Sequence, residues 1–261
     1  MDRRLSRSRE RFAVSGIVKD RAVVLRRYEY GETSLIVSVL TRGLGKVRLI
    51  AKGANKTGSP FTGALQTGSI GEIIFYYKPD RGLQTLKEIE SRNPSENYVD
   101  DLQKLCIFQA GLEVIDRSVI DREVDERHFD LLEGFMEALP GAEDPWAALF
   151  TFYVRLLNVS GVYPSTAECA VCGRPLPGEF RAVPQAGRVT CGSCSFGDAL
   201  YVSECAAGML RRMERGDFEG ISLAPKERKE IGRFLHYLFL HHIEGYRLPS
   251  ALGILKEVNR S

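Results

Sequence analysis

Hydrophobic and polar positions alternate with a period of two through most of residues 21–90. This alternation is typical of pleated strands with one buried face, and it covers residues 22–30, 33–40, 46–51, 69–78 and 83–90. A connection rich in Gly, Ser, Thr and Pro separates the third and fourth segments, at residues 53–67. Short strands with one long connection after the third predict a small β-barrel, of the OB-fold or the SH3-like kind.

The hairpin of residues 31–56 separates apolar from cationic positions. Apolar residues take alternate positions of its second strand, and cations follow at Lys46, Arg48, Lys52 and Lys56. The turn, Thr41 to Gly45, contains two glycines, which accept positive φ. Such a hairpin can hold a barrel core on one face and track a phosphate backbone on the other. An ordinary solvated surface hairpin has the same pattern.

From about residue 93 the apolar period changes to three and four, the spacing of amphipathic helices. A long helix is predicted over 98–119 with Ser95 as its N-cap, and a second over 129–139. A third begins at Asp144, a cap followed by a proline in the first turn. Further helices are predicted after Ser203, Pro225 and Pro249. Because every apolar stripe needs a partner, we expect a helical bundle.

A segment rich in Cys, Gly and Pro interrupts the helical pattern at residues 165–200. We therefore expect an α+β multidomain protein with an N-terminal OB-fold β-barrel, an α-helical bundle domain and an inserted four-cysteine zinc ribbon. The predicted parts are a flexible basic arm (1–12), the OB-fold domain (13–91), the helical domain (92–164 and 201–261) and the ribbon (165–200). The arm carries five arginines and is either a DNA-attracting arm or a solvating tail.

Two CxxC pairs indicate a metal site. Cys169 and Cys172 are separated by 18 residues from Cys191 and Cys194, a spacing typical of tetrahedral four-cysteine sites that bind zinc. Because four thiolates leave no open position, we expect one structural Zn²⁺ ion. The alternatives are a metal-free loop with reduced thiols and a redox pair. Cys106 and Cys205 fall outside the spacing, and we interpret them as structural thiols.

Charge is distributed unevenly along the chain. Residues 1–90 contain 17 Lys and Arg against 9 Asp and Glu, a net of +8, and the remainder has 19 against 25, a net of −6. A basic first third indicates an anionic partner at that end. The chain has neither an apolar run long enough to span a membrane nor a secretory signal, so we expect a cytoplasmic protein.

Common catalytic motifs are missing from the sequence. It contains no GxxxxGK[ST], GxSxG or HExxH motif. His236, His241 and His242 lack acidic or cysteine neighbours at metal spacing, so we interpret them as packing or capping residues. An acidic run over 116–126 is interpreted as a solvated helix end and loop. We predict that the protein is not an enzyme.

The residues resemble a known family. YGETSLIVSVLTRGLGKVRLIAKGA, the loop that follows and FTGALQTGSIGEIIFYYKPDRGLQTLKEIE resemble the N-terminal domain of the bacterial recombination mediator RecO. The order of strands, helices, paired CxxC motifs and final helices resembles the rest of that family, over residues 14–257. The GET and KGA motifs are the specific part, and the first dozen residues look like an extension.

The resemblance implies DNA repair and homologous recombination in the RecFOR pathway, without catalysis. It implies binding to single- and double-stranded DNA and annealing of strands coated by single-strand-binding protein. It also implies action with RecR in loading RecA, docking of the tail of single-strand-binding protein on the helical domain, and a cytoplasmic, nucleoid-associated location.

On this hypothesis, cations of the first domain contact phosphates, and such contacts are largely independent of sequence. The candidates are Lys46, Arg48, Lys52 and Lys56, helped by Arg26, Arg27 and Arg42. Tyr76 either points outward to stack a base or packs in the core.

Three other functions fit the same sequence. The first is an RNA-binding or ribosome-associated protein with the same barrel and ribbon. The second is a nucleic-acid-modifying enzyme with an unrecognised site, and the third is a protein scaffold that does not bind DNA.

Overall fold

The structure is a computed structural model that describes residues 15–183, 187–216 and 220–258. The predicted basic arm (1–12) lies outside these ranges. The chain forms two compact units: the first comprises residues up to 100 together with 118–130, and the second comprises 101–117 and residues from 131 onward. Each unit has its own hydrophobic core.

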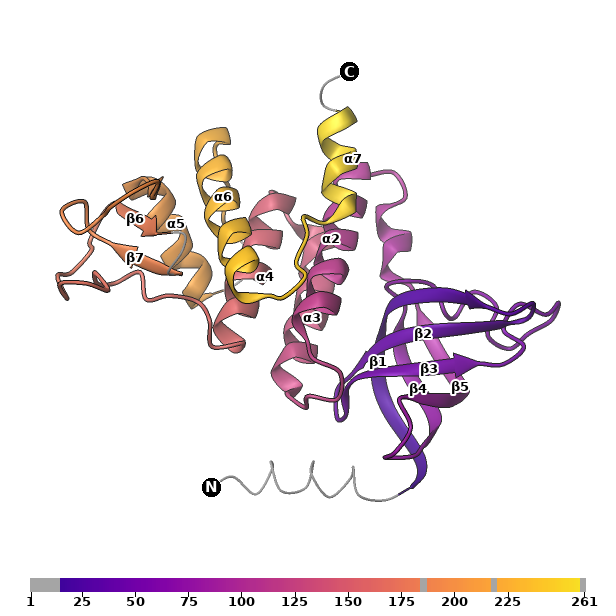
Figure 1. Cartoon of the computed structure of the whole chain (residues 1–261). Coiled ribbons are helices and arrows are strands. Elements are labelled where there is room, and N and C mark those ends of the chain that lie inside the picture. The colour runs from indigo at the N-terminus through magenta and orange to yellow at the C-terminus, as the bar shows by residue number, and fades with distance from the viewer. Residues whose placement is uncertain (1–14, 184–186, 217–219, 259–261) are drawn as a thin grey trace. The chain divides into compact units, whose positions relative to one another are not determined.

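The first unit is a five-stranded ring, shown in indigo to purple in Figure 1. Its strands are β1 (Gly16–Tyr30), β2 (Ser34–Thr41), β3 (Gly45–Ala51), β4 (Ile70–Tyr77) and β5 (Leu83–Arg92). They pair in the order β1-β2-β3-β5-β4, and β4 pairs back to β1 to close the barrel. The β3–β5 pair is parallel and the others are antiparallel. The expected OB-like barrel is therefore confirmed.

A bulge in β1 allows this long strand to pair with both of its neighbours, β4 and β2. The first half of β1 pairs with β4 and the second half with β2, and the register with β2 shifts between Val24 and Arg26. An extra residue at a bulge bends a strand and increases its twist, which a small barrel needs to close. The sequence prediction started this strand at residue 22. It therefore missed residues 16–21, which pair with β4.

The long connection between β3 and β4 contributes to the barrel core. Ala54, Phe61 and Leu65 are buried with the inward residues of the strands. A segment that looks like a polar loop therefore supplies apolar side chains to the barrel core.

We define residues 118–130 as the brace segment. Asp121 forms an isolated parallel bridge with Lys46 of β3, and the Arg122 N–H donates to the Lys46 carbonyl at 2.9 Å. The Arg122 guanidinium also donates to the Pro79 carbonyl at 2.7 Å. We expected these residues to belong to the helical domain (92–164), but backbone pairing places them with the barrel.

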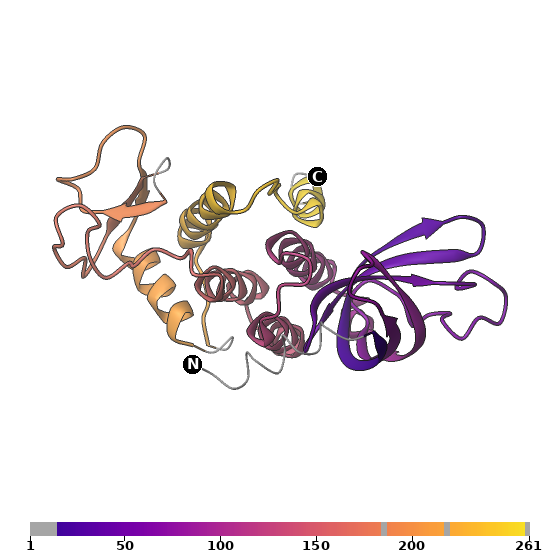
Figure 2. The same cartoon turned by 60° about the horizontal axis from the view of Figure 1, so that its bottom comes forward.

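The second unit is mainly helical. Its helices are α2 (Leu102–Ser118), α3 (Glu126–Ala138), α4 (Pro145–Val159), α5 (Glu204–Arg215), α6 (Pro225–His242) and α7 (Ser250–Val258); α3 begins in the brace segment. Short 3₁₀ turns occur at Pro94–Tyr98, in the first unit, and at Leu139–Gly141. Figure 2 shows several helices of the second unit nearly end-on. The predicted bundle is present.

Helix α4 is the centre of this unit, since most of its residues are buried. Phe152 stacks on Phe135 of α3 with ring centroids 4.8 Å apart, and Tyr153 meets Phe239 of α6 edge-on at 5.1 Å. The Asp144 carboxylate accepts from the backbone N–H groups of Trp146 and Ala147, as its predicted role of N-cap requires.

One predicted cap is wrong. The helix predicted over 98–119 is α2, which begins at Leu102, and it is preceded by the first 3₁₀ turn, inside which Ser95 lies. Asn93 caps the 3₁₀ turn, because its side chain accepts from the Ser95 N–H at 3.0 Å. At the start of α2, the Asp101 side chain accepts from the Lys104 N–H at 2.9 Å. Asn93 directly precedes Pro94 and Ser95 directly follows it, and a short polar side chain at either position can accept a hydrogen bond from a nearby backbone N–H.

The cysteine-rich segment forms a small antiparallel sheet in the order β7-β6-β8. Its strands are β6 (Phe180–Val183), β7 (Arg188–Thr190) and β8 (Leu200–Val202). Phe180 packs edge-on against Phe234 of α6 at 5.4 Å, which attaches this sheet to the helical core. Among the described residues, no helix is both long and apolar enough to cross a membrane.

Candidate metal centre and nucleic-acid interface

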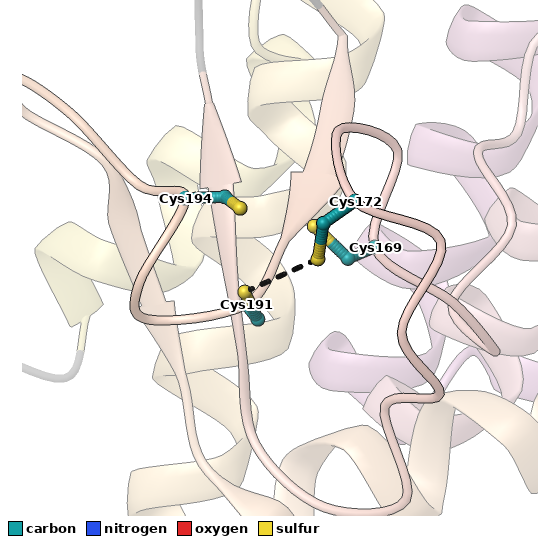
Figure 3. A group of neighbouring side chains, drawn as sticks. All are labelled: Cys169, Cys172, Cys191 and Cys194. Carbon is teal, nitrogen blue, oxygen red and sulfur yellow. Dashed lines mark hydrogen bonds between the residues drawn. The ribbon is translucent and has the colours of Figure 1, made fainter.

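The structure brings the four predicted cysteines together. The Sγ atoms of Cys169, Cys172, Cys191 and Cys194 all lie within 4.8 Å of one another, and those of Cys172 and Cys191 are 3.9 Å apart (Figure 3). A tetrahedral zinc ion with Zn–S bonds of ~2.3 Å requires sulfur–sulfur separations of about 3.8 Å. The donor set therefore fits a closed four-thiolate zinc site.

Backbone hydrogen bonds shape the first knuckle before any ion is considered. The Cys169 N–H donates to the Arg174 carbonyl at 2.8 Å, and the Gly173 N–H donates back to Cys169 at 2.9 Å. Gly173 has a φ of +68°, a value that favours glycine. The Ala170 N–H donates to Val189 of β7, which ties this knuckle to the strand leading to the second.

The thiols of the cluster do not all lose their protons with equal ease. Backbone N–H groups of Cys172 and Cys191 lower the pKa of Cys169 to about 6. The neighbouring Cys172 and Cys191 sulfurs raise the pKa of Cys194 to about 12. A cation at the centre removes this conflict, because metal ligation deprotonates a coordinating thiol.

The other two cysteines lie outside this cluster. Cys106 is buried in α2, and burial raises the pKa of its thiol. Cys205 is exposed in the first turn of α5. Neither residue joins the group that could hold a metal ion.

The cationic hairpin has the predicted two faces. Val47, Leu49 and Ala51 belong to the barrel core, whereas Arg48 is exposed and Ile50 is partly exposed. The alternation read from the sequence thus gave the correct inward and outward residues of β3.

The brace segment supplies carboxylates to three of the predicted DNA-contacting cations. Asp121 pairs with Lys46 at 3.3 Å and with Arg48 at 3.0 Å. Asp130 pairs with Arg42 at 2.9 Å. The Lys46 side chain is only 12% exposed, whereas that of Arg48 is 62% exposed. Lys46 is therefore a structural partner of Asp121, while Arg48 stays accessible to solvent.

The remaining candidate DNA-contacting cations do not all lie on one face of the barrel. Arg26 pairs across the sheet with Ser38, which in turn pairs with Arg48, so both arginines lie on the outer face. Arg27 is the next residue of β1 and projects to the opposite side, toward the face of its partner Val37. Lys52 and Lys56 are exposed just beyond β3, in the connection to β4.

Tyr76 points outward, with 45% of its surface exposed. Its neighbours Phe75 and Tyr77 fill the core instead. The alternative that Tyr76 packs in the core is therefore wrong, and the ring is available to a ligand.

Sequence reasoning missed a pocket in the second unit. This pocket has a volume of about 330 Å³ and an aromatic lining that includes Trp146, Phe150 and Tyr153. Arg228, Lys229 and Arg233 of α6 contribute cations to it. The signal was present as basic residues one turn apart beside the apolar stripe of α6, but the residues of α4 that complete the pocket are far away in sequence.

Comparison with known families covers both units. A family model described as Recombination protein O N terminal matches residues 15–94, and one described as Recombination protein O C terminal matches residues 99–251. These ranges take in the barrel and most of the helical unit with its four cysteines.

Curated relatives named DNA repair protein RecO are similar along nearly their whole length. The protein from Frankia casuarinae is 33% identical over 236 residues, covering 88% of this chain and 96% of the relative. The protein from Streptomyces griseus is 30% identical over 237 residues, covering 87% and 95%. The protein from Geobacter metallireducens is 28% identical over 239 residues, covering 91% and 96%. The chain belongs to the RecO family of DNA repair and recombination proteins.

Proposed function

We propose that this protein is a non-catalytic recombination mediator that binds single- and double-stranded DNA and anneals strands coated by single-strand-binding protein. In this role it helps RecR to load RecA. The observation that carries the proposal is the outer face of an OB-like barrel on which Arg26 and Arg48 lie together. Cations on one face lower the repulsion between two phosphate backbones, so annealing needs no covalent step.

The metal site supports this role through the fold. Four cysteines in a closed tetrahedral set leave no position for water or substrate, so bound zinc would stabilise the ribbon. We therefore assign one structural Zn²⁺ ion to the protein and no catalytic metal.

Charge reversal tests the DNA-binding face. We expect Arg48→Glu with Lys52→Glu to weaken binding to single-stranded DNA and to reduce the slope of log affinity against log salt by about 1.4, at ~0.7 per lost phosphate contact. Lys19→Glu is the matched control, because Lys19 is an exposed β1 cation paired with Glu72 at 2.6 Å, away from Arg48. Equal effects of both variants, or none, would contradict this assignment.

Two further measurements separate the rivals. RNA that outcompetes single-stranded DNA of the same length would favour the RNA-binding function. Turnover of gapped DNA under metal titration would indicate an enzyme. Annealing of complementary strands coated by single-strand-binding protein, without turnover, supports the mediator function.

We further propose that the pocket of the second unit receives the C-terminal tail of single-strand-binding protein. Its aromatic wall suits an apolar side chain, and the cations of α6 suit acidic residues or a terminal carboxylate. Arg233→Glu should abolish binding of a tail peptide, as measured by calorimetry. Lys226→Glu, in the first turn of the same helix and outside the pocket lining, should leave it unchanged.

A further inference from the structure

One row of outward side chains crosses all the strands of the barrel. Residue pairing connects Tyr28 of β1 to Ile36, Ile36 to Ile50, Ile50 to Thr85 and Thr85 to Tyr76 of β4. We call these residues the outer row: Tyr28, Ile36, Ile50, Thr85 and Tyr76. Adjacent strands lie about 4.8 Å apart, so the row runs roughly 19 Å around the barrel.

The outer row is apolar yet open to solvent. Its terminal rings, Tyr28 and Tyr76, are 49% and 45% exposed. The three residues between them are partly exposed, and their strand neighbours, such as Val37 and Leu49, are in the core. An aromatic ring at each end of an apolar strip gives flat faces on which planar groups can stack.

Cations flank this row on both sides. Arg26 and Arg48 lie two residues before Tyr28 and Ile50 on their strands, about 6.6 Å away at ~3.3 Å per residue. Arg26 donates to the Tyr28 hydroxyl at 3.1 Å, which holds that ring beside a guanidinium. Lys52 follows Ile50 by two residues on the other side. Apolar faces between cations match the alternation of bases and phosphates along a strand.

The row also lies where OB-folds bind oligonucleotides. Tyr28 is close to the turn between β1 and β2, Tyr76 is close to the turn between β4 and β5, and Ile36 and Ile50 lie on β2 and β3. The faces of strands 2 and 3 and these two turns form the usual oligonucleotide site of the fold.

We propose that the outer row is a base-stacking track, in which Tyr28 and Tyr76 stack on unpaired bases and Ile36 and Ile50 contact the bases between them. This inference rests on the proposed DNA-binding function and specifies how the barrel distinguishes single strands from duplex. Bases of a duplex are already stacked on each other, so only an unpaired strand can use the row.

Tyrosine substitutions test the track on a single-stranded oligothymidylate of about 15 nucleotides, within the usual OB-fold site size. We expect Tyr28→Ala and Tyr76→Ala each to weaken binding about tenfold, the effect of losing one stacked base. Tyr28→Phe keeps the ring and should bind within about twofold of the unchanged protein. The salt slope should stay constant in all three variants, since no phosphate contact is lost.

Tyr201→Ala provides the matched control. Tyr201 is 44% exposed, similar to Tyr28 and Tyr76, but it belongs to β8 of the second unit. Its replacement should change affinity by less than about twofold. Equal losses for Tyr201→Ala and Tyr28→Ala would overturn the track.

An oligonucleotide of abasic sites separates this inference from the function on which it rests. It keeps the phosphates and has no bases, so the unchanged protein and Tyr28→Ala should bind it equally weakly. If the unchanged protein binds abasic and normal strands alike, the track is wrong while DNA binding stands. If it binds neither strand at low salt, the proposed function itself fails.

Discussion

Gly45 begins β3 in a conformation and a space that exclude side chains. Its φ is +67°, and a Cβ atom there would lie 2.1 Å from the carbonyl oxygen of Glu123 in the brace segment. The sequence predicted a glycine turn at this point, but the close contact comes from a residue far along the chain. Local turn chemistry was therefore predictable and the tertiary reason was not.

Gly45→Ala should destabilise the barrel by more than the ~1–3 kcal/mol of backbone strain alone, because the new methyl group also displaces Glu123. Gly31→Ala is the control, since Gly31 has a φ of +62° with nothing within 4 Å of its added Cβ. Urea denaturation followed by circular dichroism gives both values. A loss no larger for Gly45→Ala than for Gly31→Ala would show that the contact with Glu123 yields easily.

His128 makes the stability of the protein sensitive to mild acid. It is 7% exposed, and burial lowers its pKa from the ordinary value of 6.5 against the opposing charges of Asp125 and Glu123. Below pH 6.5 the unfolded chain therefore binds a proton that the folded chain does not. Stability due to this residue is complete above that pH and is lost as pH falls.

His128→Asn should flatten the dependence of Tm on pH between about 6.5 and 5, relative to the unchanged protein. His242, whose pKa is also lowered by burial and by the neighbouring His241, should keep the remaining part of the slope in this variant. A steeper slope for His128→Asn would contradict the depressed pKa.

At the scale of elements, strand alternation predicted β2 to β5 closely and gave the inward residues of β3 correctly. It could not predict that the acidic run would meet the cationic hairpin. Asp121 and Asp130 look like solvated charges in sequence, and only the fold places them beside Lys46, Arg48 and Arg42. Ion pairs between residues far apart in the chain leave no periodic pattern in the sequence.

Asp121→Asn should strengthen DNA binding, because it leaves Arg48 without its carboxylate at the edge of the outer row. Because Arg48 is already counted as a phosphate contact in the unchanged protein, the salt slope should stay the same while the affinity rises at every salt concentration. Lys46, whose side chain is only 12% exposed, loses the same carboxylate, so the free energy of unfolding should fall and binding should be compared where both proteins are fully folded. Asp125→Asn is the control, because Asp125 pairs with Arg127; weaker DNA binding by Asp121→Asn would mean that Asp121 positions Arg48 for DNA.

For the whole molecule, the metal ligands were predictable because two knuckles have a fixed local spacing. The division into units was less predictable. The chain leaves the barrel at residue 100, forms α2, returns for the brace segment and departs again at residue 131. Apolar periodicity marks where helices lie and carries no information about which core receives the segment between them.

Zinc removal should affect the units unequally. A chelator should lower the Tm of the metal-bound protein, because the ion's binding free energy contributes to folding of the ribbon. Cys172→Ser should reproduce that loss, and Cys205→Ser, which alters an exposed thiol outside the cluster, should not. DNA affinity at low salt should persist after chelation, since the outer row belongs to the barrel. Unchanged Tm on chelation, with no zinc in freshly reduced protein, would exclude the structural ion.

The brace segment has a consequence for synthesis on the ribosome. All five strands have been translated by Arg92, yet the partner of Lys46 and the residue packed on Gly45 are Asp121 and Glu123. At ~5–20 residues per second, synthesis reaches Asp121 and Glu123 a few seconds after it has passed Arg92. During that interval Lys46 and Arg48 lack Asp121, so the emerging domain exposes more positive charge than the finished protein. A chain truncated after β5 would lack Asp121 and Glu123 altogether.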